Sequence, residues 1–197
     1  SVINGNIINI TGSGDGMGVV GNVVNITNTT IITTGGGKGI ILTGSTNGTL
    51  RGINIKTNAS NAYGIYTNTS SFSSFEIFDS ILNASASGTG DFFIDGATIA
   101  TTKGSIWNLT NVTGSNINID RNFSIGANGT LNVHWYLEAF ANYTNSTNAT
   151  NANITAFNKN NLTQFSVLTG ANGRIARQIL LEYSQNGTSE GNTTYYS

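Results

Sequence analysis

The sequence predicts an all-β protein, and three observations support that fold class. Apolar residues recur two positions apart in runs of three to five residues, which is the period of a strand with one buried face. No segment keeps a helical period along its length. The chain also has 25 Gly and 30 Asn, which readily adopt the positive φ angles of tight turns. We therefore expect short strands joined by turns.

The first two thirds of the chain is expected to form a solenoid. Strand-like runs occur at residues 7–10, 23–26, 40–42, 53–55, 64–66, 75–77, 92–94 and 117–119. These runs are shorter than the strands of a hairpin-built sandwich, and they cluster with a coarse period of about 20 to 25 residues. In such a coil Ile, Val and Phe fill a narrow core, while Asn and Thr stack at the corners.

Three neighbouring segments carry a family resemblance. They are Leu-Arg-Gly-Ile-Asn-Ile-Lys at 50–56, Ala-Tyr-Gly-Ile-Tyr at 62–66, and the run ending in Phe-Asp-Ser-Ile-Leu-Asn at 70–83. Their order resembles the repeats of right-handed parallel β-helix proteins, the pectin-lyase-like architecture, over roughly residues 2–128. The resemblance implies a right-handed β-helix, or β-solenoid, domain over residues 1–129.

The pattern changes near residue 130. Residues 131–141 alternate for too long to fit one solenoid face, and further strands are expected at 152–158, 163–169 and 175–183. With the Trp-Tyr-Leu of 135–137 and the Asn-Gly-Arg of 172–174, this part looks like the immunoglobulin-like β-sandwich that follows β-helices in archaeal cell-surface proteins. The resemblance implies a second domain over residues 130–197, with about five strands where a sandwich has roughly seven.

A sandwich that lacks strands would leave backbone donors and acceptors unpaired at one edge. Two explanations stay open. An extended segment of a neighbouring subunit, such as residues 1–10, completes the sheet by strand addition. Alternatively, the chain has been shortened.

The chain is unusually rich in acceptor triplets for N-linked glycan. Eighteen Asn-x-Ser/Thr sequons occur in 197 residues, whereas a random order of 30 Asn and 47 Ser plus Thr gives roughly seven. The excess indicates a glycan-coated protein on a secretory route, so we expect an extracellular or cell-surface location. The alternative is that Asn-rich turns create sequons by accident. The sequons begin at Asn9, Asn25, Asn28, Asn47, Asn58, Asn68, Asn83, Asn108, Asn111, Asn122, Asn128, Asn142, Asn145, Asn148, Asn153, Asn161, Asn186 and Asn192.

The composition argues against several other classes of function. Charged residues make up 9 %, against about a quarter in ordinary soluble domains, so either glycan supplies the solubility or the surface is buried against other copies. The net charge is −1 and the cations are scattered, which argues against nucleic-acid partners. With no Cys and one His, thiolate zinc sites and multi-histidine metal sites are excluded. No apolar run approaches the roughly 18 residues of a membrane span.

Catalysis is not expected. Asp91 and Asp95 would share a strand face about 13 Å apart, farther than the paired carboxylates of glycosidases. Asp120 and Arg121 are adjacent, so in a strand they would point to opposite faces. The glycine-rich segments 12–18 and 34–39 lack the Lys-Ser/Thr of a phosphate loop and precede no helix, so we interpret them as loops.

The aromatic residues allow a sugar-binding alternative. His134 and Tyr136 should face one side of a strand and Trp135 the other, where we expect Trp135 in the sandwich core. Exposed contact surface is better expected from a set of four tyrosines. These are Tyr63, Tyr66, Tyr195 and Tyr196.

The sequence thus predicts a heavily N-glycosylated, self-assembling structural subunit of a surface filament, sheath or S-layer, with an archaeal source favoured. Its partners would be other copies in a head-to-tail homopolymer, and its only added groups covalent N-linked glycans. One alternative is an adhesin that binds surface polysaccharide. Another is a polysaccharide-degrading enzyme.

Overall fold

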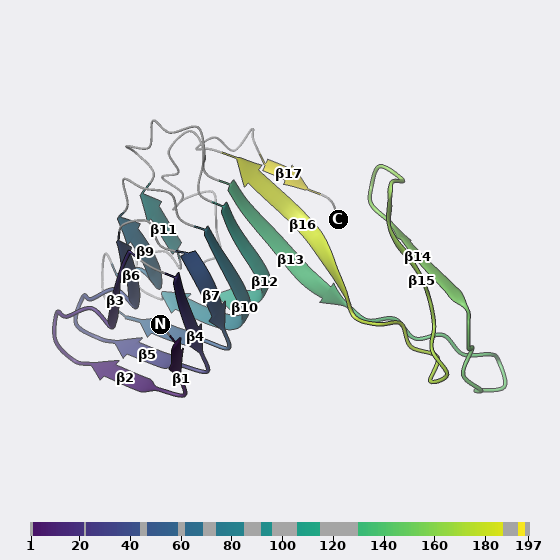
Figure 1. Cartoon of the computed structure of the whole chain (residues 1–197), viewed down its shortest axis with the longest axis horizontal. Coiled ribbons are helices and arrows are strands. Elements are labelled where there is room, and N and C mark those ends of the chain that lie inside the picture. The colour runs from purple at the N-terminus through teal and green to yellow at the C-terminus, as the bar shows by residue number, and fades with distance from the viewer. Residues whose placement is uncertain are drawn as a thin grey trace.

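The computed structural model describes residues 2–21, 23–43, 47–58, 62–68, 74–84, 92–95, 106–114, 130–186 and 193–195 (Figure 1). These residues form seventeen strands and no helix, and most strands pair in parallel with a strand about one coil away. The predicted all-β solenoid is therefore confirmed. The strand expected at residues 117–119 lies outside the described ranges.

Successive coils of the solenoid repeat three strands. The first coil has β1 (Val2–Asn4), β2 (Ile7–Ile10) and β3 (Met17–Val20); the second has β4 (Val23–Thr27), β5 (Thr30–Thr33) and β6 (Ile40–Thr43). The third has β7 (Asn47–Arg51), β8 (Asn54–Thr57) and β9 (Ile65–Asn68). Next come β10 (Ser74–Ala84), which runs through two faces, β11 (Phe92–Asp95) and β12 (Ile106–Gly114).

The coil length is less regular than the sequence indicates. One column of paired residues across the sheet is Val2, Asn25, Thr49, Glu76, Asn108 and Asn132. The advance along the chain is 23, 24, 27, 32 and 24 residues. The two longer coils exceed the predicted period because more residues separate their strands, while the strands keep their register.

The core is a stack of aliphatic side chains inside the coils. Ile26, Leu50, Ile77, Leu109 and Val133 pair in one column, and all five side chains are buried. Each such side chain stabilises the fold by about 1.5–3 kcal/mol through removal of apolar surface from water. The strands alternate between these inward residues and polar outward ones, as the period of two predicts.

One corner of the solenoid depends on residues that tolerate positive φ. Gly5, Asn28, Gly52, Asp79 and Asn111 occupy this corner in successive coils, with φ between 48° and 69°. Only Gly and, less easily, Asn and Asp adopt this conformation cheaply. The backbone at this corner still forms hydrogen bonds between coils: the Asn28 N–H donates to the Arg51 carbonyl at 2.9 Å, and the Gly52 N–H to the Phe78 carbonyl at 3.0 Å.

The C-terminal strands are arranged differently from the expected sandwich over residues 130–197. β13 (Thr130–Leu137) pairs in parallel with β12, so the sheet continues across the boundary predicted after residue 129. β16 (Gln178–Asn186) and β17 (Thr193–Tyr195) then extend the same sheet in antiparallel pairing. The physical reason is that Leu131 and Val133 alternate like the inward residues of the solenoid and become part of its core.

Between β13 and β16 the chain forms a projecting segment, residues 138–177, which we call the arm (Figure 1). It contains β14 (Asn153–Phe157) and β15 (Thr163–Leu168), which form a two-stranded antiparallel sheet of their own. The strands predicted at 152–158 and 163–169 are therefore present, but as a hairpin. Nowhere in the described ranges is there a helix able to cross a bilayer.

Candidate functional site

The outer face of the sheet carries a chain of polar side chains across four strands. Ser184 Oγ donates to Asn132 Oδ1 at 2.7 Å, and Asn132 Nδ2 donates to Asn108 Oδ1 at 2.7 Å. Asn108 Nδ2 in turn donates to Glu76 Oε1 at 2.6 Å. We call these four residues the polar ladder. Strand alternation places them outward because their chain neighbours Ile77, Leu109 and Val133 face the core.

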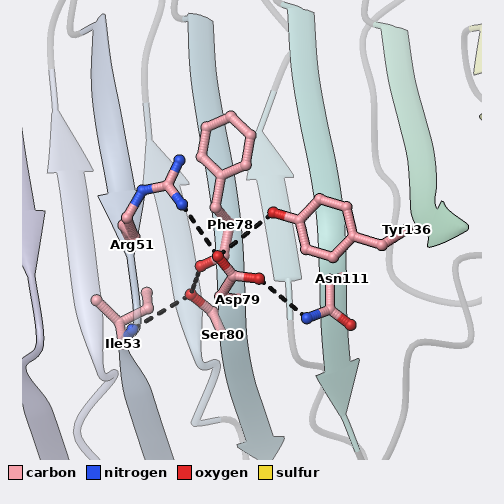
Figure 2. Close-up of polar contacts among 7 residues, drawn as sticks. All are labelled: Arg51, Ile53, Phe78, Asp79, Ser80, Asn111 and Tyr136. Atoms are coloured by element: carbon pink, nitrogen blue, oxygen red, sulfur yellow. Dashed lines mark hydrogen bonds and ion pairs between the residues drawn. The ribbon is translucent and has the colours of Figure 1, made fainter. Parts of the chain in front are cut away.

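A second cluster surrounds the corner residue Asp79 (Figure 2). Its carboxylate accepts hydrogen bonds from Arg51 Nη1 at 3.0 Å, Asn111 Nδ2 at 3.0 Å and the Tyr136 hydroxyl at 3.4 Å. Beside it, Ser80 Oγ donates to the Phe78 carbonyl at 2.6 Å. Asp79, on β10, therefore contacts side chains from three other strands of the sheet, β7, β12 and β13, and its oxygens are already used by the fold.

Between the ladder and this cluster lies a cleft of about 230 Å³, lined by Glu76, Phe78, Asn108, Thr110, His134 and Ile179. His134 Nδ1 is buried there without a hydrogen-bond partner. Burial lowers the pKa of the His134 imidazole below its usual value, while a backbone contact with Leu109 and the charge of Glu76 oppose that shift. The cleft thus combines a carboxylate, one carboxamide, a hydroxyl, an imidazole and an aromatic ring, a set suited to binding a small polar group.

The glycine-rich segments are explained by packing. Segments 12–18 and 34–39 are stacked turns of neighbouring coils: a Cβ on Gly35 would meet the Gly12 carbonyl oxygen at 2.3 Å, and one on Gly37 the Gly14 oxygen at 1.8 Å. Asp15 Oδ1 accepts the Lys38 N–H at 2.8 Å between them. They serve as tight corners, which agrees with their interpretation as loops.

The other candidate residues are not brought together into a site by the part of the structure that is described. Asp95 ends β11, while Asp91, Asp120 and Arg121 lie outside the described ranges. Within those ranges no three His, Asp or Glu side chains are close enough to hold a metal ion.

The expected core position of Trp135 is wrong. Its side chain is 36 % exposed, and its indole N–H donates to Glu182. It lines a second, apolar groove of about 220 Å³ with Phe157 at the tip of the arm and Leu180 of β16. Trp135 faces away from His134 and Tyr136, as alternation predicts, and lines this groove beside residues of the arm.

The tyrosines expected at the surface are partly engaged. The rings of Tyr63 and Tyr66 lie 5.8 Å apart, and Lys38 Nζ stands 4.8 Å from the centre of the Tyr66 ring. Tyr196 and the side chain of Tyr195 lie outside the description.

The sequons occupy unequal environments. Ten have an exposed Asn: Asn9, Asn25, Asn28, Asn47, Asn58, Asn142, Asn145, Asn148, Asn153 and Asn161. Three have a partly buried Asn: Asn83, Asn108 and Asn111. The side chains of the remaining five are outside the description: Asn68, Asn122, Asn128, Asn186 and Asn192.

Comparison with known proteins gives no relative: no family model, curated protein or solved structure matches the chain significantly. Function must therefore be argued from the geometry of this chain. Sequence reasoning missed the polar ladder and the Asp79 cluster, because both depend on a coil of 32 residues, and the Asp79 cluster also on one of 27, that the irregular period did not give.

Proposed function

We propose that this chain is a structural subunit of an extracellular surface assembly (a filament, sheath or S-layer), that it carries N-linked glycan, and that copies join by strand addition. The observation that carries the proposal is the edge of the first coil. Among the described residues, β1, β2 and β3 each pair with a single strand, on one side only. At the first coil, each of the three faces of the solenoid thus ends in a strand that has a partner on one side only.

This edge combines unpaired backbone groups with apolar side chains. Val2, Ile7 and Val20 are 75 %, 80 % and 75 % exposed there. Behind them, Ile3 and Ile8 pack against the core but are only partly buried. An edge of this kind is a template for pairing with another chain, and natural proteins usually block it with charge, Pro or a covering element.

Strand addition at this edge would be head-to-tail. The first coil would meet a different surface of the next copy, and a contact of this type produces a fibre unless the rotation closes a ring. The low charge of the chain supports close packing of copies, because only 9 % of its residues are charged.

The test is negative-stain electron microscopy of the protein purified from its native source, together with mass spectrometry of its N-terminus. Regular filaments or sheets, built from chains in which no further coil covers β1, β2 and β3, would support the proposal. Dispersed particles of one chain's mass would contradict it, as would an upstream coil of the same chain on that edge.

The cleft beside the polar ladder favours one other candidate function, an adhesin that binds polysaccharide. Glu76 and Asn108 offer hydrogen-bonding groups, and Phe78 offers an apolar ring face. This function requires a monomer whose binding to polysaccharide is lost in Glu76→Ala. Titration of the purified protein with a panel of oligosaccharides would distinguish it from the assembly.

A further inference from the structure

We propose that, within the part of the chain that the structure describes, the arm is the main glycan-bearing element, with Asn142, Asn145, Asn148 and Asn161 as acceptors, and that Asn108 carries no glycan although it begins a sequon. The inference rests on the proposed function, since it assumes a glycosylated chain, and it divides the sequons into acceptors and structural residues.

The chemistry sets the requirement. In N-glycosylation the bond from the sugar C1 to the phosphate oxygen of a lipid-linked oligosaccharide breaks, and a bond from C1 to the Asn Nδ2 forms. The lipid phosphate leaves with the bonding electrons, and Nδ2 loses one proton. The transferase reads the Asn and the hydroxyl two residues later, so both side chains must be reachable.

The arm meets this requirement repeatedly. At Asn142, Asn145, Asn148 and Asn161 both the Asn and the Thr two residues later are exposed. At Asn145 the carboxamide oxygen accepts the Thr147 N–H at 3.1 Å and the Thr147 hydroxyl at 2.7 Å, so both contacts use the oxygen and not the acceptor nitrogen. In the described solenoid only Asn9, on the edge strand β2, has the same double exposure.

Asn108 differs from these residues in its burial and in its place within the sheet; among the four acceptors, Asn148 also donates through Nδ2, to the Ala171 carbonyl at 3.4 Å, but it is exposed. It lies on β12, which pairs with β10 on one side and β13 on the other. Its Nδ2 donates to Glu76 at 2.6 Å, and its Oδ1 accepts from Asn132 at 2.7 Å. The hydroxyl-bearing Thr110 is 3 % exposed. To reach both groups, a transferase would have to remove β12 from the sheet.

The surface of the arm gives independent support. It exposes five large apolar side chains: Phe140, Tyr143, Phe157, Leu162 and Leu168. Glycan on the neighbouring acceptors would shield it from other proteins.

The first test is glycopeptide mapping of the protein from its native source. We expect glycan on the peptides with Asn145 and Asn161, and an unmodified peptide with Asn108. Glycan on Asn108 at the occupancy of Asn145 would overturn the division and leave the glycoprotein proposal standing. Absence of glycan from every sequon would overturn both.

Two variants expressed in the native host extend the test. Asn142→Gln should lose the mass of one glycan and keep its melting temperature after deglycosylation. Asn108→Gln should keep the full glycan mass and melt roughly 3–6 °C lower, because the polar ladder loses its central member. Thr110→Val serves if Asn108→Gln fails to fold: it removes the sequon but keeps Asn108, so any loss of glycan mass would refute the inference.

Discussion

The solenoid and the arm are built on opposite principles. In the solenoid, one column of paired residues, Ile26 to Val133, places an aliphatic side chain over another aliphatic side chain in each next coil, and it is buried throughout. In the arm, only two apolar side chains, Ala149 and Ile175, are buried. A two-stranded hairpin is marginally stable by itself, so the arm must be held by something other than a core.

Polar turn contacts have that role. Asn158 Oδ1 accepts the N–H groups of Asn160 at 2.9 Å and Leu162 at 3.0 Å, which closes the tip of the hairpin. Thr169 is buried; its hydroxyl donates to the Ala149 carbonyl and accepts the Ala152 N–H at 3.0 Å. The comparison teaches that side-chain volume matters in the solenoid, whereas in the arm the turn residues matter and the surface tolerates change.

The largest expected effect tests that difference directly. Leu109→Ala empties a buried site in the solenoid and should lower the free energy of unfolding by about 2–5 kcal/mol. Leu168→Ala in the arm removes the same atoms from a side chain that is 60 % exposed and should change it by less than about 0.5 kcal/mol. Urea denaturation of both variants measures the effects, and equal losses would contradict the comparison.

The corner of the solenoid should show a smaller effect. Asp79→Ala places a residue that disfavours positive φ at 50° and removes the acceptor of Arg51, so we expect a loss of about 1–3 kcal/mol. Asp79→Asn keeps the shape and the tolerance of positive φ, and should lose less than half as much. If thermal unfolding finds the two variants equal, the backbone conformation is not the reason for Asp79.

Acid should weaken the fold slightly through His134. Burial lowers the pKa of this imidazole in the folded state, so the unfolded chain binds the proton more readily. The contribution of His134 to the free energy of unfolding is therefore fully present above the unfolded pKa of about 6.5. It decreases as the pH falls toward the lower folded pKa. Urea denaturation at pH 7.5 and pH 5.5 should give a smaller pH difference for His134→Gln than for the natural chain. An unchanged difference would assign the effect to other groups.

The smallest effect is expected at the surface of the arm. Arg177 and Glu138 form an exposed ion pair, with Arg177 Nε donating to Glu138 Oε1 at 2.7 Å. Exposed pairs of this type contribute little because water and salt screen them. Glu138→Gln should leave the melting temperature unchanged within measurement error, and a clear decrease would show that the base of the arm is held by charge.

Much of the solenoid could be predicted from the sequence, because a period of two in short runs has a local cause. Ile53 and Ile55, for example, are both buried as their alternation requires. The local sequence pattern of a strand does not indicate which other strand it pairs with, or which sheet it joins. The run at 131–141 was expected to begin a sandwich, yet Leu131 and Val133 complete the solenoid core. Local pattern identified the strand but not its partner.

The candidate site was less predictable for a related reason. The polar ladder joins Glu76 to Asn108, 32 residues later, and then to Asn132 after 24 residues. Only the coil lengths bring these residues together, and the number of residues between the strands sets those lengths. Asn108 was therefore identified only as one of eighteen sequons, although its carboxamide belongs to the fold.

The most direct test of the proposed assembly is a pair of charged substitutions compared by electron microscopy. Ile7→Lys adds a charge to the open edge strand β2, whereas Ile81→Lys adds the same charge to an exposed position on β10 that pairs with Asn54 on one side and Thr113 on the other. Charge on an edge blocks strand addition, so we expect Ile7→Lys to abolish filaments or sheets and Ile81→Lys to keep them. Assembly that survives Ile7→Lys as well as Ile81→Lys would contradict the account that copies join at this edge.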